Sequence, residues 1–155
     1  MKATVACVGI RQPDWAKAAV DDYLRRFPKD FEVVIKAVKP ESRTGASPQK
    51  IKSEEAARLE AVCPKDAYVV VMDERGQTLT SAAFAAWIAK KATDYRDIAF
   101  VIGGADGLDE AFKARAQASI RLSDMTLPHA LARVFLVEQL YRAWSILAKH
   151  PYHRE

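Results

Sequence analysis

Two short, uninterrupted apolar runs constrain the possible folds of this chain most, because a strand of mainly apolar residues has no face suited to exposure to water. They are Ala67–Met72 (AYVVVM) and Asp97–Ile102 (DIAFVI). Runs of this kind occur where a strand is covered on both faces, as in a parallel sheet with helices on each side. We therefore expect both runs inside such a sheet.

Segments of strand and helix character alternate along the rest of the chain. We expect further strands at 4–10, 31–38 and 120–123, and helices at 14–27, 47–63, 81–93, 108–118 and 128–149. Ser47 and Pro48 suit the start of a helix, and 73–76 is expected to be a turn. This alternation predicts a single α/β domain over residues 1–155, with a Rossmann-like, mainly parallel sheet.

The composition is typical of a cytoplasmic protein with one core. Half of the 155 residues are hydrophobic, which argues against disorder. No apolar run approaches the ~20 residues of a membrane-spanning helix, and the N-terminus lacks the pattern of a signal peptide. Cys7 and Cys63 have no CxxC partner, so we expect free thiols in a reducing compartment.

The net charge of +4 is mildly basic. A modest positive excess helps a protein to approach an RNA or DNA backbone. A solvated surface with more lysine than glutamate explains the charge at least as well, so charge alone does not identify a partner.

Three loops follow the expected strands and carry the first indication of a site. They are Met72–Gly76, Gly103–Gly107 and Leu122–Pro128. Ligands of open parallel sheets bind at the carboxyl ends of the strands. If these strands are neighbours, their loops converge on one pocket.

Two of these loops have the composition of a ligand site as well as that of ordinary turns. Gly103 and Gly104 would allow a close approach of a ligand to the backbone, but the GxGxxG spacing and the Lys-Ser/Thr of a phosphate loop are missing. In Leu122–Leu127, backbone amides could bind an adenine edge while apolar side chains cover the ring. The alternatives are a tight turn at Gly103 and a loop in which Thr126 caps the next helix.

The long helix at 128–149 is apolar on two faces. A helix of this kind needs two partners, and we expect its own sheet to be one and a second subunit to be the other. This predicts a homodimer. On the remaining polar stripe, Glu138 and Arg142 are spaced to form an ion pair.

The C-terminal residues HPYHRE are unusually rich in functional groups. His150 and His153 form a weak metal signal without a third ligand, and we expect no metal. Tyr152, His153 and Arg154 suit nucleic acid better, as a stacking ring, a hydrogen-bonding imidazole and a cation for phosphate.

The chain resembles the RlmH family of SPOUT-class methyltransferases over its full length. The resemblance is carried by PDW (13–15), YLRRFPKD (23–30), FVIGGADGL (100–108), LSDMTLPHALARVFLVEQLYRAWSI (122–146) and HPYHRE (150–155). It implies a C-terminal trefoil knot, although knots are so rare that general rules exclude them. It also implies a homodimer without a membrane partner that binds S-adenosylmethionine. The implied cofactor-binding residues are Met72, Gly103, Gly104, Leu122, Ser123, Asp124, Met125, Thr126 and Leu127.

The resemblance further implies N3-methylation of a pseudouridine in the helix 69 loop of 23S rRNA, on the assembled ribosome. We expect Arg142, and next Arg154, to favour the anionic base, and His129 or His153 to accept the proton. The RNA-binding surface is expected to contain Arg133, Arg142, Tyr152, His153 and Arg154.

Two other functions compete with this interpretation. One is a non-catalytic ribosome-binding factor that keeps the basic tail but lacks donor binding. The other is an α/β enzyme for a nucleotide or small metabolite, against which the lack of a dinucleotide fingerprint counts.

Overall fold

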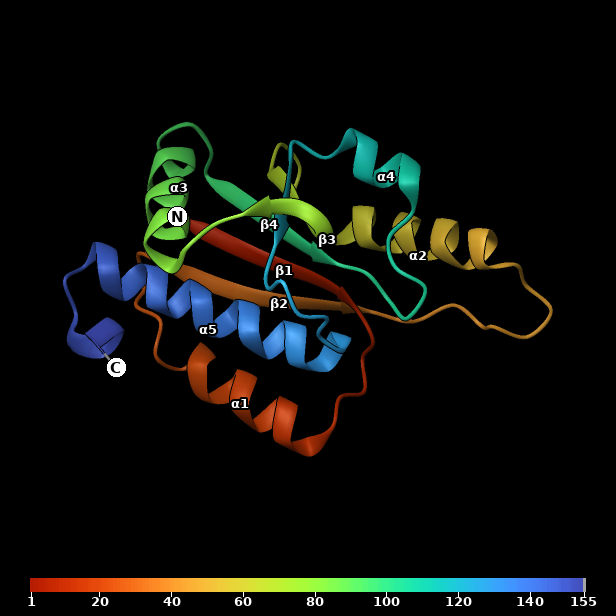
Figure 1. The fold of residues 1–155 in the computed structure, drawn as a ribbon, viewed down its shortest axis with the longest axis horizontal. Helices are drawn as coiled ribbons and strands as arrows, with labels where there is room; N and C mark the ends of the chain where they lie inside the picture. Colours follow the sequence, from red (N-terminus) through yellow and green to blue (C-terminus); the bar gives the residue numbers. More distant parts are fainter. Residues whose placement is uncertain (155) are drawn as a thin grey trace.

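The computed structural model describes residues 1–154 and is organised around one five-stranded, all-parallel sheet (Figure 1). The strands are β1 (Lys2–Val8), β2 (Glu32–Val38), β3 (Tyr68–Thr78), β4 (Asp97–Ile102) and β5 (Ala118–Arg121). Their order is β2-β1-β4-β3-β5. The predicted α/β class is confirmed, and the strands formed by the two apolar runs, β3 and β4, both lie inside the sheet.

Helices cover both faces of the sheet. They are α1 (Asp14–Leu24), α2 (Pro48–Val62), α3 (Ser81–Asp94), α4 (Glu110–Arg115), α5 (His129–Leu147) and the 3-10 turn η1 (Pro151–Arg154). Helices α1, α3 and α5 lie on one side of the sheet and α2 and α4 on the other (Figure 1). No helix within residues 1–154 is both long enough and apolar enough to cross a membrane.

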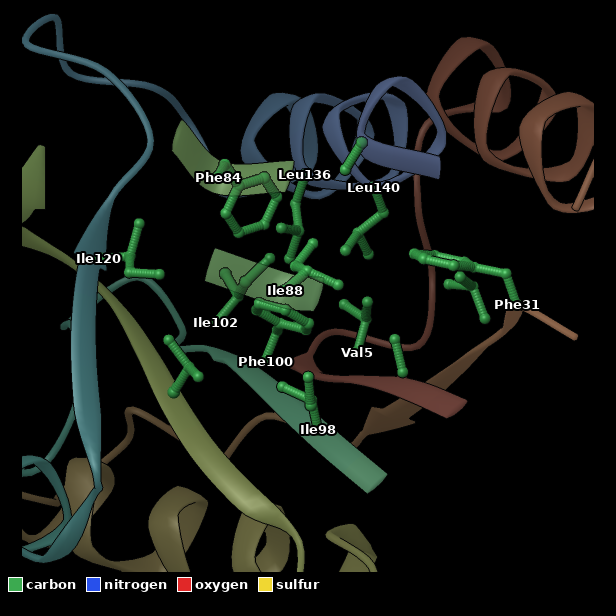
Figure 2. Close-up of a cluster of buried hydrophobic side chains, with 14 of the residues drawn as sticks. Val5, Phe31, Phe84, Ile88, Ile98, Phe100, Ile102, Ile120, Leu136 and Leu140 are labelled. Atoms are coloured by element: carbon green, nitrogen blue, oxygen red, sulfur yellow. The ribbon is translucent and has the colours of Figure 1, made fainter. Parts of the chain in front are cut away.

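The buried strand β4 divides the core into two layers. Phe100 packs on the side of α3 and α5, among Val5, Ile88 and Leu136 (Figure 2). Val101, the next residue, faces the opposite layer with α2 and α4. Successive side chains of a strand point to opposite faces, so a strand in this position needs apolar residues throughout. This explains why Asp97–Ile102 shows no polar alternation.

Several element boundaries differ from those expected. Strand β5 lies at Ala118–Arg121 instead of 120–123, and α4 is confined to Glu110–Arg115. The largest difference is at 73–76, where the prediction of a turn was wrong because β3 continues to Thr78. Met72 and Gln77 both pair with Ile120 of β5, so the four residues between them form a bulge in the strand.

The chain itself partly covers the second face of α5. Tyr141 packs on Tyr23 of α1 and on Phe27 just after it, with ring centroids 6.0 and 5.4 Å apart. Leu131 and Leu147 remain exposed on α5. The apolar second face therefore does not by itself require another subunit. The homodimer and the trefoil knot stay predictions.

Gly76 allows the bulge of β3 to lie directly against β5. A Cβ atom built on Gly76 would lie 2.6 Å from the carbonyl carbon of Ile120 and 2.8 Å from that of Ser119. These are backbone atoms, so the clash could be relieved only by separating the two strands.

We therefore expect Gly76→Ala to lower the free energy of unfolding by about 1–3 kcal/mol, the usual cost of overpacking. Urea denaturation followed by circular dichroism would measure it. Gln77→Ala, at the exposed neighbouring position, is the control and should change stability by less than about 0.5 kcal/mol. Equal effects of the two substitutions would contradict the close approach of β3 to β5.

Candidate functional site

The three loops at the strand ends do meet, and they enclose a cavity of about 680 Å³. The cavity lies at the carboxyl ends of β3, β4 and β5, which are neighbours in the sheet. Residues 72–75, 102–108, 121–123 and 125–129 contribute to its lining. This confirms the convergence predicted from the order of strands and loops, and the volume falls in the range of small-molecule sites.

The glycine loop is both a tight turn and a wall of the cavity. The Gly107 N–H donates a hydrogen bond to the Gly104 carbonyl at 3.0 Å. A Cβ atom on Gly103 would lie 2.9 Å from the Gly107 carbonyl carbon and from Cγ of Leu108. The turn thus requires glycine at position 103, and it brings bare backbone to the cavity.

The loop before α5 presents apolar side chains to the cavity. Leu122, Met125 and Leu127 line it, and Met125 is 80% exposed. Asp124 is not among the lining residues and pairs with Arg121 at 3.0 Å. The Ser123 hydroxyl accepts the Met125 N–H at 3.0 Å, which shapes the loop.

Thr126 lines the cavity but does not cap the following helix. Pro128 occupies the N-cap position of α5, and the helix has no side-chain capping hydrogen bond. The interpretation of this segment as an ordinary capped loop was therefore wrong.

A charged wall, which the sequence analysis missed, faces these loops. Lys113 Nζ lies 3.3 Å from Asp73 Oδ2 and 3.0 Å from Glu110 Oε1, and all three residues line the cavity. The available signal in the sequence was the position of Asp73 immediately after the apolar run Ala67–Met72. Lys113 lies in a surface helix whose sequence carries no comparable indication.

The predicted catalytic residues lie at opposite ends of α5. His129 is its first residue and lines the cavity. Arg142 follows 13 residues later, which corresponds to about 20 Å along a helix. His153 and Arg154 lie in η1, beyond the far end of α5 (Figure 1). The chain therefore brings only His129 to its own cavity.

Arg142 takes part in a saturated network at this far end. Its Nη2 and Nε atoms donate to Glu138 Oε2 at 2.8 and 3.1 Å, which confirms the predicted pair. Tyr152 donates its hydroxyl to the same oxygen at 2.8 Å. The Tyr23 hydroxyl lies 2.8 Å from that of Tyr152 and must donate to it, because Tyr152 has only one O–H. Glu138 is thus occupied as an acceptor.

This network controls the ionisation of its members. The hydrogen bond with Glu138 raises the pKa of Arg142, against the effect of burial. Burial raises the pKa of the Tyr152 phenol well above its usual value, and the hydrogen bonds with Tyr23 and Glu138 add to this. Around neutral pH, Arg142 is therefore a fixed cation and Tyr152 is neutral.

The tail packs against the end of α5. The Tyr152 ring lies 4.7 Å from that of Tyr141, and Arg142 lies 5.1 Å from the Tyr152 ring centroid. The His150 ring lies 5.1 Å from that of Trp144. Nδ1 of His153 is buried without a hydrogen-bond partner among the residues described. Tyr152 thus packs beside Arg142, and His153 and Arg154 follow it in η1; a shared RNA-binding surface stays a prediction.

Arg133 was wrongly expected on the RNA-binding surface. It is 5% exposed, and its Nη2 donates to the carbonyls of Val8 at 3.2 Å and Gly9 at 2.9 Å. These carbonyls lie at the end of β1, so the guanidinium joins α5 to the centre of the sheet. Its role in this chain is structural.

Comparison with known proteins gives consistent matches over the full length. A family model described as "Predicted SPOUT methyltransferase" matches residues 1–153. The chain is 52% identical to a protein of Albidiferax ferrireducens named "Ribosomal RNA large subunit methyltransferase H". Proteins of the same name from Variovorax paradoxus and Paracidovorax citrulli are 54% and 51% identical. Each comparison covers 100% of both chains, so the likeness spans the cavity and the tail alike.

We expect Arg133→Met to lower the free energy of unfolding by about 1–3 kcal/mol, since the buried carbonyl of Val8 and the partly buried carbonyl of Gly9 lose a charged donor. Urea denaturation is the measurement. Arg154→Met, at an exposed position of the tail, should leave stability within about 0.5 kcal/mol. Unchanged stability of Arg133→Met together with weaker RNA binding would restore Arg133 as an RNA contact.

Proposed function

The chain belongs to the SPOUT methyltransferase family, and from this membership we propose that it methylates large-subunit ribosomal RNA with S-adenosylmethionine as the donor. The specific reaction that we propose is N3-methylation of a pseudouridine in the helix 69 loop of 23S rRNA, on assembled ribosomes in the cytoplasm. The observation that carries the proposal is the cavity formed by three strand-end loops, in a chain that matches relatives named as ribosomal RNA methyltransferases from end to end.

The residues of the cavity fit this donor. Backbone at Gly103 and Gly104 lines the cavity and can contact the donor, and Met72, Leu122 and Leu127 supply apolar cover. We propose that the loop 122–127 binds the adenine, with Ser123 and Met125 holding its shape through their hydrogen bond. Asp124 would act on the loop from outside, through Arg121. When bound, the donor supplies an electrophilic methyl group.

Methyl transfer also requires that the pseudouridine loses its N3 proton, so that N3 can attack the methyl group. His129 lines the cavity, and the unprotonated nitrogen of an imidazole can act as a proton acceptor. A nearby guanidinium favours the anionic form of the base. Arg142 is a permanent cation suited to this role, with Arg154 second. Glu138 is a poor general base because its Oε2 already accepts hydrogen bonds from Arg142 and Tyr152.

A homodimer would allow His129 and Arg142 to act at the same site, although the length of α5 keeps them apart within one chain. Arg142 lies about 20 Å along α5 from His129 in the same chain, and Tyr152 of the tail packs beside Arg142. We therefore propose that the cavity of one subunit is completed by Arg142, Tyr152, His153 and Arg154 of the partner subunit, which also bind RNA. Exposed apolar side chains at Ile10, Trp15 and Leu131 are consistent with a subunit contact.

Methyl transfer to ribosomes that lack this modification tests the activity directly. With labelled S-adenosylmethionine, we expect one N3-methylpseudouridine in the helix 69 loop, identified by mass mapping of the RNA. Ribosomes carrying uridine at the same position test whether the pseudouridine is required. Donor binding without transfer to any ribosomal particle would contradict the proposed substrate, and absence of donor binding would favour a ribosome-binding factor.

Mixing two inactive variants tests the shared site. Gly103→Val removes the close approach of the glycine loop, and His153→Ala alters the tail of the other chain. After subunit exchange, half of the dimers contain one chain of each variant. In such a mixed dimer one site carries both substitutions, and the other combines an intact cavity with an intact tail. We expect recovery of about a quarter of the wild-type rate. Failure to recover activity, with mixed dimers detected by mass spectrometry, would place both groups in one subunit.

A further inference from the structure

The charged wall of the cavity carries an ion pair between two well-shielded side chains. We propose that Asp73 and Lys113 bind the amino-acid end of the methyl donor. This inference rests on the proposed function and names the residues that hold one part of the donor, the ammonium and carboxylate of its methionine.

The geometry distinguishes Asp73 from the other partner of Lys113. The side chains of Asp73 and Lys113 are each 18% exposed, and that of Glu110 is 69% exposed. Among the ion pairs of residues 1–154 that include a cavity-lining residue, Asp73–Lys113 is the most shielded. Glu110 therefore holds Lys113 from the solvent side, and Asp73 is its partner within the wall.

Both residues are held at the cavity by the fold around them. Asp73 is the first residue of the bulge in β3, where the strand leaves its regular pairing with β5. Lys113 is on α4, which follows the glycine loop directly and begins at an N-cap formed by the side chain of Asp109. A bulge commonly redirects a side chain toward a site. The sheet and the helix thus place one carboxylate and one ammonium on the same wall.

Each member of the pair keeps bonding capacity for a ligand. The closest contact with Lys113 is made by Oδ2 of Asp73, and a carboxylate has a second oxygen, Oδ1, that can also accept hydrogen bonds. Lys113 has three N–H groups and two carboxylate partners. An acceptor beside a donor matches an α-amino acid, which offers an ammonium and a carboxylate. Hydrogen bonding to Glu110, and after it the effect of Asp73, raises the pKa of Lys113, so this cation persists around neutral pH.

The other charged residues of the lining offer no shielded pair of this kind. Asp106 pairs with the exposed Arg43, and Arg121 pairs with the exposed Asp124. Lys52, Glu74 and Arg75 also line the cavity, and Glu74 and Arg75 are exposed.

The loop of Leu122, Met125 and Leu127 offers apolar side chains. Placing charged groups there without counter-ions would be costly. The nucleoside therefore matches this loop, and the charged end matches the wall with Asp73 and Lys113.

A pair of ligands isolates the amino-acid end. S-adenosylhomocysteine contains it, whereas 5′-methylthioadenosine has the same nucleoside and thioether without it. Titration calorimetry would compare both ligands on the wild type, the isosteric Asp73→Asn and Lys113→Met. We expect each variant to bind S-adenosylhomocysteine about tenfold more weakly, the loss of one charge-assisted contact. Binding of 5′-methylthioadenosine should be unchanged. The control is Arg115→Met, which lies on the same helix as Lys113 and removes an exposed ion pair with Glu60 of α2; it should alter the binding of neither ligand.

Three results would overturn the inference. Equal losses for both ligands would show that the pair acts on the nucleoside or on the shape of the pocket. Unchanged affinity for both would show an ion pair with a structural role only. If the wild type binds neither ligand, the proposed donor is wrong and the inference falls with it. Thermal melting of each variant verifies that the protein compared is folded.

Discussion

The parallel pairing of β4 between β1 and β3 is the constraint on which the rest of the molecule depends. Each residue of β4 from Ile98 to Ile102 is buried, so both faces of the sheet must be covered by helices. Because all strands run in the same direction, their carboxyl ends emerge at one edge. The cavity forms at that edge, and its position is a direct consequence of the hydrogen-bonded order of the strands.

Helix α5 connects two regions with different chemistry. Its first turn carries His129 at the cavity, and its middle and C-terminal part carry Glu138 and Arg142 beside the packed tail. Arg133 anchors the helix between them by donating to the end of β1. The length of the helix separates the two regions within one chain, since a rigid helix cannot shorten. The site that we propose to be shared between two subunits would use both regions.

The bulge in β3 has two consequences for the cavity. Gly76 lets the bulge lie against the backbone of β5, so that β3 and β5 remain paired on both sides of the bulge. Asp73, at its start, is left free of regular pairing and contributes to the charged wall with Lys113. The same local irregularity thus maintains the sheet and supplies a polar side chain to the site. In an uninterrupted strand, the side chain of residue 73 would point to whichever face of the sheet the pleat assigns to it.

The sequence by itself determined the class of fold and most of the cavity. Continuous apolar strands, the helices between them and the glycines after β4 are local features, and they predicted three converging strand-end loops. Local patterns did not predict that β3 continues through 73–76, that Lys113 faces Asp73, or that Arg133 turns inward to β1. Only the tertiary structure decided these points. Each of these points depends on a contact with a residue that is distant in the sequence. Hydrophobic periodicity and secondary-structure propensity carry no information about such contacts.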